Sequence, residues 1–286
     1  MNIAIIVNTT KKKAISCSHE IIRMLSSHGA RVLMPPDCAG RIESDEVTFC
    51  VSMDQLFEKS DIAVTVGGDG TIIDAAKYAA RSDIPLIGVN VGRLGFVTNI
   101  EADETEYLLK LLTGDYTCEK RTLLDVAVQK PGSVSHYIAV NDVVVAHGQL
   151  SKIVDLHLWL NNEEIAGYRA DGLLFSTPTG STAYSLSAGG PILSPQMDCI
   201  LMTPVCPHSL FSRSVLFGGD ETLAVTVKIP PRCSCVLTVD GEQNINIEEE
   251  DRVVVRKSAL TLQLLSVKKY NFYRRLNEKL KERELS

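Results

Sequence analysis

The stretch that decides the fold of the first part of the chain reads Ile62-Ala63-Val64-Thr65-Val66-Gly67-Gly68-Asp69-Gly70-Thr71. Residues 62–66 are apolar and mostly β-branched, which predicts a buried strand. This strand runs directly into a glycine-rich turn, and residues 71–80 have the composition of a helix. A strand, a tight turn and a helix form the repeating unit of α/β folds, which place their ligands at such turns.

The flanking sequence repeats this alternation of strands and helices. Further strands are expected at residues 2–7, 31–34 and 86–89, and a further helix over residues 14–27. Gly29 follows where that helix would stop. Because alternating strands and helices build parallel sheets that are covered on both faces, residues 1–115 are predicted to form an α/β domain.

The pattern changes near residue 115 to many short strand-like runs with few helices. Turn signals such as Pro131-Gly132 and Asn161-Asn162 separate several of the runs. Residues 116–267 are therefore predicted to form a β-rich domain, a sandwich. The runs are residues 123–128, 137–145, 153–160, 164–168, 173–176, 222–229, 236–240, 245–247, 252–255 and 260–265. The last segment of the chain is helical by composition.

Composition and charge argue against several classes of protein. Of the 286 residues, 45% are hydrophobic and 22% are charged, which is typical of a globular protein. The formal net charge of −6 and the absence of a basic stripe argue against nucleic-acid binding. No apolar run approaches the roughly 20 residues that span a bilayer, so no membrane association is expected. No secretory segment is recognisable, and the expected location is the cytoplasm.

The eight cysteines are expected to be free thiols rather than metal ligands. They are spread along the chain, no pair has the CxxC spacing, and no histidine cluster accompanies them. Free thiols are typical of a reducing compartment. No metal site formed by the protein alone is predicted.

Asp69 is the candidate for chemistry within the glycine-rich turn. The neighbouring glycines let a ligand approach the backbone, and the N–H groups at the start of a helix favour an anion such as a phosphate chain. A carboxylate would repel that anion, so Asp69 makes sense as the acceptor of a proton from an attacking hydroxyl, or as the ligand of a metal that bridges the two. A tight turn with Asp69 as helix N-cap is the alternative. The GxxxxGK[ST] and GxGxxG fingerprints are absent.

Two further segments have the polar side chains of a binding site. Residues 169–191 combine several hydroxyl side chains with glycine turns, which suits hydrogen bonding to a polar ligand. Within them, Tyr184 offers a ring and a hydroxyl to a base or ribose, and Asp171 is an acceptor. Asn141 and Asp142 interrupt a run of valines and have the groups that grip vicinal hydroxyls of a ribose. A solvated serine-rich turn and a strand-end turn are the respective alternatives.

Taken together, these motifs resemble the NAD kinase family. The run 171–191 is specific and decides the resemblance, whereas diacylglycerol kinases, sphingosine kinases and phosphofructokinases have similar glycine-rich pentapeptides. The matching segments follow the family's order and are residues 67–71, 88–96, 141–142, 171–191, 203–210 and 240–243.

The resemblance implies an enzyme that transfers a phosphoryl group from ATP, or from polyphosphate, to the 2′-hydroxyl of the adenosine ribose of NAD. Asp69 would be the general base, with Gly70 beside the nucleotide. Mg²⁺ would arrive with ATP. The family fold is an α/β domain followed by a β-sandwich. The C-terminal helix, residues 268–286, would pack back on the first domain, and the chain would form a homodimer or homotetramer.

The resemblance also implies which residues bind NAD. Phe96 would pack near the adenine, Asn141 and Asp142 would hold ribose hydroxyls, and Asp171 would contact the nicotinamide end. Further contacts would come from Arg169, Thr182, Ala183, Tyr184, Ser187 and Gln243. The family usually has Glu where this chain has Asp142, which is one methylene shorter and changes the reach of the carboxylate.

Two other functions fit parts of the pattern. A lipid kinase would share the glycine-rich turn, but it would need an apolar pocket where residues 176–187 are polar. A dinucleotide sensor without activity would share the binding segments, but it would have no use for the carboxylate of Asp69.

Overall fold

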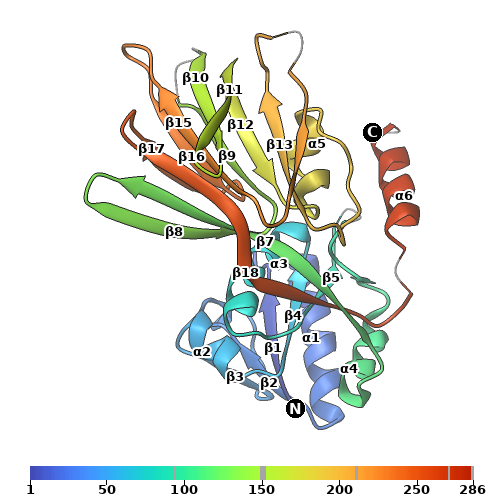
Figure 1. The fold of residues 1–286 in the computed structure, drawn as a ribbon. Coiled ribbons are helices and arrows are strands. Elements are labelled where there is room, and N and C mark those ends of the chain that lie inside the picture. Colours follow the sequence, from blue (N-terminus) through green and yellow to red (C-terminus); the bar gives the residue numbers. More distant parts are fainter. Residues whose placement is uncertain (93–94, 149–152, 210–211, 270, 285–286) are drawn as a thin grey trace. The chain divides into compact units, whose positions relative to one another are not determined.

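The computed structural model describes residues 1–92, 95–148, 153–209, 212–269 and 271–284 (Figure 1). The chain divides into two compact units. Met1–Lys120 and Leu262–Ser286 form the first, and Arg121–Thr261 form the second. The chain passes between the units within two long strands, β7 (Thr117–Lys130) and β18 (Arg252–Ser266).

The first unit is built on a parallel sheet, as predicted. Its strands lie in the order β3-β2-β1-β4-β5, and the end of β18 pairs in parallel with β5. The central strand β4 is buried along its whole length, which is typical of a parallel sheet with both faces covered. The strands are β1 (Asn2–Val7), β2 (Arg31–Met34), β3 (Val47–Phe49), β4 (Ile62–Gly67), β5 (Leu86–Asn90) and the short β6 (Ile100–Glu101) beside β5.

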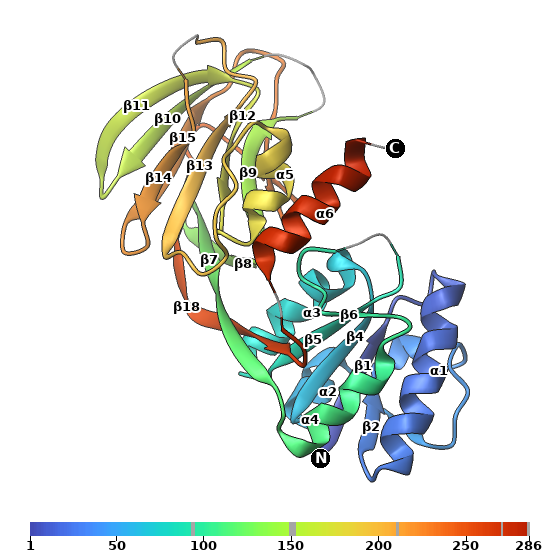
Figure 2. The same cartoon turned by 90° about the vertical axis from the view of Figure 1, so that its right-hand side faces the viewer.

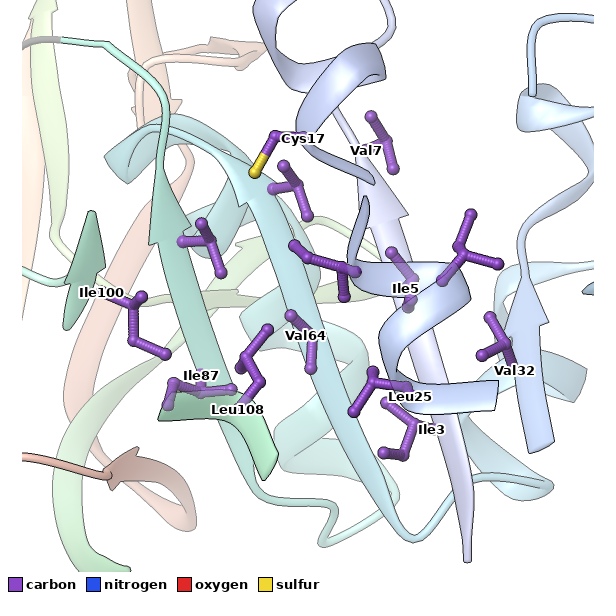
Figure 3. Close-up of a cluster of buried hydrophobic side chains, with 14 of the residues drawn as sticks. Ile3, Ile5, Val7, Cys17, Leu25, Val32, Val64, Ile87, Ile100 and Leu108 are labelled. Carbon is purple, nitrogen blue, oxygen red and sulfur yellow. The ribbon is translucent and has the colours of Figure 1, made fainter. Parts of the chain in front are cut away.

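Helices cover both faces of this sheet. One face packs against α1 (Lys12–Ser27), with Cys17 and Leu25 over Ile5 and Val64 in a single apolar cluster (Figure 3). The same cluster includes Leu111 of α4 (Lys110–Thr113), which lies on the same side of the sheet as α1 (Figure 2). The other face contacts α3 (Asp69–Arg81), which in turn contacts α2 (Met53–Glu58).

The second unit is a sandwich of antiparallel sheets. One sheet has the order β14-β13-β12-β9-β16-β17. The other includes β11-β10-β15-β18, with the hairpin β7-β8 also on β18. Apolar side chains from both sheets, such as Phe175 and Leu156, share one core. The strands not yet named are β8 (Ser133–Ala139), β9 (Asp142–His147), β10 (Val154–Leu160), β11 (Glu163–Ala170), β12 (Gly172–Ser176), β13 (Cys199–Val205), β14 (Val215–Gly218), β15 (Thr222–Lys228), β16 (Cys235–Val239) and β17 (Gln243–Ile247).

The predicted fold class is confirmed, with an α/β part and a β-rich part, but several of the predicted strands have different bounds. The expected run 137–145 is broken between β8 and β9, and the two runs 252–255 and 260–265 form the continuous strand β18. The break has a physical cause. The side chain of Asp240 accepts the backbone N–H groups of Val140 and Asn141, the two residues between the strands, and these groups are therefore not available to a ladder.

The C-terminal helix α6 (Phe272–Glu284) belongs to the first unit. Just before it, Lys268 forms an ion pair with Glu104. Arg275 of the helix is buried and donates to the carbonyl of Gly95 and to the carboxylate of Glu101. These contacts fix α6 to the segment that follows β5.

Candidate active site

The first part of the candidate site lies at the turn between β4 and α3, where Asp69 is the first residue of the helix. Gly68 is the N-cap, so the alternative of Asp69 as the N-cap is wrong. The Asp69 carboxylate instead accepts the backbone N–H of Phe96 at 2.8 Å and that of Val97 at 3.1 Å. Two charge-assisted hydrogen bonds from the backbone fix the position of this carboxylate.

Gly95 is required by the close approach of the Asp69 carboxylate. A Cβ at Gly95 would overlap this carboxylate and the hydroxyl of Thr98. The close approach of the carboxylate thus explains the glycine at position 95, and the sequence alone did not reveal this.

Lys279 of α6 completes the surroundings of Asp69. Its Nζ lies 3.6 Å from Oδ2 of Asp69 and 3.9 Å from the centroid of the Phe96 ring. The Phe96 side chain is buried, and the face of its ring that carries Lys279 is covered in this conformation. Sequence reasoning missed Lys279, because the basic residues of the tail looked like a solvated helical face. The available signal was the spacing of four between Arg275 and Lys279, which puts both on one side of a helix.

The second part of the candidate site is a cavity of about 420 Å³ within the second unit. Four of the predicted residues line it together: Asn141, Asp142, Ala183 and Tyr184. The other lining residues were not predicted as site residues. They are Val144, Ala146, His147, Val236, Thr238, Asp240 and Gly241.

Asp240 shapes this cavity through the backbone. Its carboxylate accepts the N–H groups of Val140, Asn141 and Asp142 at 2.8–3.2 Å, and its own N–H donates to the carbonyl of Asp142 at 2.9 Å. Asp240 and Gly241 both have positive φ, at 49° and 75°, in the tight turn between β16 and β17. Asp-Gly is a favoured pair for such a turn, and it is a signal in the sequence that could have predicted this hairpin.

Asp142 is a buried carboxyl beside a second negative charge. Burial and the charge of Asp240 raise its pKa from 3.8 to about 7, although a hydrogen bond from the backbone N–H of Tyr184 acts in the opposite direction. Hydrogen bonding to a ligand hydroxyl would replace water at this carboxyl, which suits it to a ribose.

Asp171 and Arg169 were also predicted as site residues, and neither is among the residues that line the cavity. Asp171 is half-buried, and its Oδ1 lies 3.9 Å from Nε2 of His147, which lines the cavity. Arg169 is exposed and pairs with Asp155 of the adjacent strand β10 at 3.2 Å.

The remaining predicted residues are not among those that line the cavity. Thr182 is buried, and its hydroxyl donates to the carbonyl of Thr179. Ser187 is exposed at the end of α5 (Tyr184–Ser187), and Gly70 is exposed in the first turn of α3. Gln243 pairs with Val239 through its backbone, and its side chain lies outside the described residues.

Within the described residues, no group of three or more His, Cys, Asp and Glu side chains is arranged to hold a metal ion. No helix in the same part of the chain has the length and apolar character needed to cross a membrane.

Comparisons with known proteins match both halves of the chain. Residues 3–116 match the family model of the ATP-NAD kinase N-terminal domain, and residues 140–267 match that of the ATP-NAD kinase C-terminal domain. The chain belongs to the NAD kinase family. The predicted family is therefore confirmed, and membership of a kinase family removes the support for a sensor without activity.

NAD kinases are similar to this chain over nearly its full length. The NAD kinase of Natranaerobius thermophilus is 38% identical over 282 residues, which cover 98% of this chain and 97% of the relative. That of Cellvibrio japonicus is 37% identical, covering 97% of this chain and 95% of the relative. Among solved structures, yeast NADH kinase complexed with NADH has a TM-score of 0.90 at 27% identity, covering 98% of this chain and 87% of that chain. An NAD kinase from Archaeoglobus fulgidus in complex with ATP shares the fold, with a TM-score of 0.75 at 22% identity over 98% of this chain and 99% of that chain.

Proposed function

We propose that this chain transfers the γ-phosphoryl group of ATP to the 2′-hydroxyl of the adenosine ribose of NAD and produces NADP and ADP. Its membership of the NAD kinase family supports the reaction. The observation that carries the proposal at the level of residues is the carboxylate of Asp69, which two backbone N–H groups fix at the start of α3. A fixed proton acceptor thus stands at a helix N-terminus, which attracts phosphate.

In the proposed step, Asp69 accepts the proton of the 2′-hydroxyl as its oxygen attacks the γ-phosphorus. A bond forms between these two atoms, and the bond from the phosphorus to the β–γ bridging oxygen breaks, so that ADP leaves. The first N–H groups of α3, that of Gly70 among them, have no partner within the helix and attract the phosphate chain. Phosphoryl transfer depends mainly on alignment and charge stabilisation, which a rigidly held carboxylate and a helix end supply.

The cavity of the second unit is proposed to bind part of NAD. Its volume of about 420 Å³ falls within the range of small-molecule sites. Asn141 and Asp142 would hold vicinal hydroxyls of a ribose, and Tyr184 would place its ring against a base. The other proposed contacts with NAD are Phe96, Arg169, Asp171, Thr182, Ala183, Ser187 and Gln243.

Mg²⁺ is proposed to enter as part of the substrate Mg-ATP and to be held by phosphates and water, as is usual for this ion. Polyphosphate is the proposed second donor. We expect the chain to act in the cytoplasm as a homodimer or homotetramer. Light scattering on the purified protein tests the proposed assembly, and the mass of a monomer would contradict it.

The test of the reaction is a coupled assay. Purified protein, NAD and Mg-ATP are incubated with a dehydrogenase that accepts NADP but not NAD. With the substrate of that dehydrogenase present, we expect NADPH to form only when the chain, NAD, ATP and Mg²⁺ are all present. Folded protein that forms no NADP with ATP, other nucleotides or polyphosphate would refute the proposed function.

A further inference from the structure

Lys279 is a cation that the far end of the chain brings to Asp69. Its side chain is only 18% exposed, whereas the Arg274 and Glu278 side chains, which form a pair on the same helix, are 82% and 50% exposed. Arg274 and Glu278 thus face solvent, as expected of charged residues on a surface helix, whereas Lys279 is largely covered. A charged side chain that keeps a helix soluble would be exposed, so the covered position of Lys279 needs another explanation.

The contacts of α6 hold Lys279 at this place. One helical turn before it, the buried Arg275 donates from Nε to the Gly95 carbonyl at 2.6 Å and from Nη2 to Glu101 at 2.9 Å. Glu101 in turn accepts from the side-chain amide of Asn90 at the end of β5. The segment that donates N–H groups to Asp69 is thus the same segment that anchors the helix carrying Lys279.

The charges at the turn between β4 and α3 suggest a function for Lys279. A phosphate chain at the N-terminus of α3 would be attracted by the helix end and repelled by the carboxylate of Asp69. Lys279 is the cation that the structure places against that carboxylate. Its separation of 3.6 Å from Oδ2 exceeds the roughly 2.7–2.9 Å of a charge-assisted hydrogen bond. An ammonium group has three donors, so Lys279 has the capacity to contact a carboxylate and a phosphate oxygen together.

We propose that Lys279 is a charge-compensating residue of the phosphoryl-transfer site, which binds the terminal phosphate of the donor and offsets its repulsion by Asp69. This inference rests on the proposed function, because it requires the donor phosphates to lie at the start of α3. Among the described side chains of α6, Lys279 is the one proposed to contact the donor phosphate, and Arg275 holds the helix in place.

The test compares three variants in the NADP assay. Lys279→Met removes the charge and keeps an unbranched side chain, and Lys279→Arg keeps the charge. Lys281→Met is the matched control, since Lys281 lies on the same helix and is exposed. We expect Lys279→Met to lower kcat/KM for Mg-ATP by about 100- to 1000-fold, as for loss of one group that stabilises developing charge. KM for NAD should change little, Lys279→Arg should recover most of the loss, and Lys281→Met should match the unmodified chain.

Two measurements distinguish a role of Lys279 in the reaction from a merely structural role: restoration of turnover by an added amine, and the melting temperature of the variants. In Lys279→Ala, ethylammonium ions should restore part of the turnover with Mg-ATP, while the same concentration of sodium ions should not, because only the former replaces the lost ammonium. Equal kcat/KM values for Lys279→Met and Lys281→Met would overturn the inference. So would a loss that follows a drop in melting temperature and that neither Arg nor ethylammonium restores. In both cases NADP formation by the unmodified chain would leave the proposed function standing, whereas its absence would remove both.

Discussion

At the scale of residues, three carboxylates with the same chemistry have different partners. Asp69 accepts two backbone N–H groups and faces Lys279, and Asp240 accepts three backbone N–H groups. Asp142 is buried beside Asp240, and its pKa is raised to about 7. Sequence reasoning selected Asp69 and Asp142 from their neighbours along the chain. It did not select Asp240, because the partners of Asp240 lie about a hundred positions away.

The raised pKa of Asp142 predicts how stability depends on pH. Below about pH 4 the carboxyl is protonated in the folded and in the unfolded chain. Between about pH 4 and pH 7 only the unfolded chain releases the proton, so the free energy of unfolding falls as pH rises, and the loss is complete above about pH 7. The free energy of unfolding of Asp142→Asn should therefore rise relative to that of the unmodified chain as the pH increases from about 4 to about 7. The total difference should be on the order of 2–4 kcal/mol.

Urea unfolding at a series of pH values measures this difference. Asp45→Asn is a suitable control, because Asp45 is exposed and its removal should leave the pH dependence unchanged. Parallel curves for the unmodified chain and Asp142→Asn would contradict the raised pKa.

Gly95→Ala should remove activity through Asp69. The added methyl group overlaps the carboxylate and displaces it, and a misplacement of this size costs on the order of 100-fold in rate. Gly167→Ala is the control, since a Cβ at Gly167 has no heavy atom within 4 Å. The turnover numbers of the two variants in the NADP assay decide the point, with melting curves to show that both are folded. A Gly95→Ala variant as active as Gly167→Ala would contradict the close approach.

At the scale of elements, the sequence was most informative where a pattern is local. The strands β1 and β2 have the predicted bounds, because their apolar runs end at polar or proline residues. The short strand β3 was not predicted, since three residues give no measurable alternation. The break between β8 and β9 was missed because a side chain from another hairpin causes it.

Asp240→Ala should destabilise the second unit by about 2 kcal/mol or more, because buried backbone N–H groups lose their acceptor. It should also raise KM for NAD, since Asn141 and Asp142 lose their fixed position in the cavity. Asp240→Asn keeps an acceptor oxygen and the tolerance of positive φ, so its effect on stability should be smaller. Urea unfolding and NAD titrations measure both effects, and equal stabilities for the Ala and Asn variants would show that the acceptor is unimportant.

At the scale of the whole molecule, the order of motifs along the chain was enough to predict the family and the combination of an α/β and a β-rich part. The order of motifs did not predict which candidate residues line the cavity of the second unit, or which side chains surround Asp69. Four predicted residues do line one cavity in the second unit, and Asp69 lies at the predicted turn of the first. The position of Lys279 could not be predicted from the sequence. It depends on where the C-terminal helix packs, and no local pattern encodes that packing.

Whether Asp69 is the catalytic base is decided by the turnover number of Asp69→Asn with NAD and Mg-ATP, compared with that of Asp74→Asn. Asp74 is exposed on the same helix, so its variant controls for loss of a charge near the start of α3. We expect Asp69→Asn to lower kcat by about 100- to 10,000-fold while NAD still binds, and kcat of Asp74→Asn to stay near the value of the unmodified chain. A nearly unchanged kcat for Asp69→Asn would contradict the assignment of Asp69 as the base.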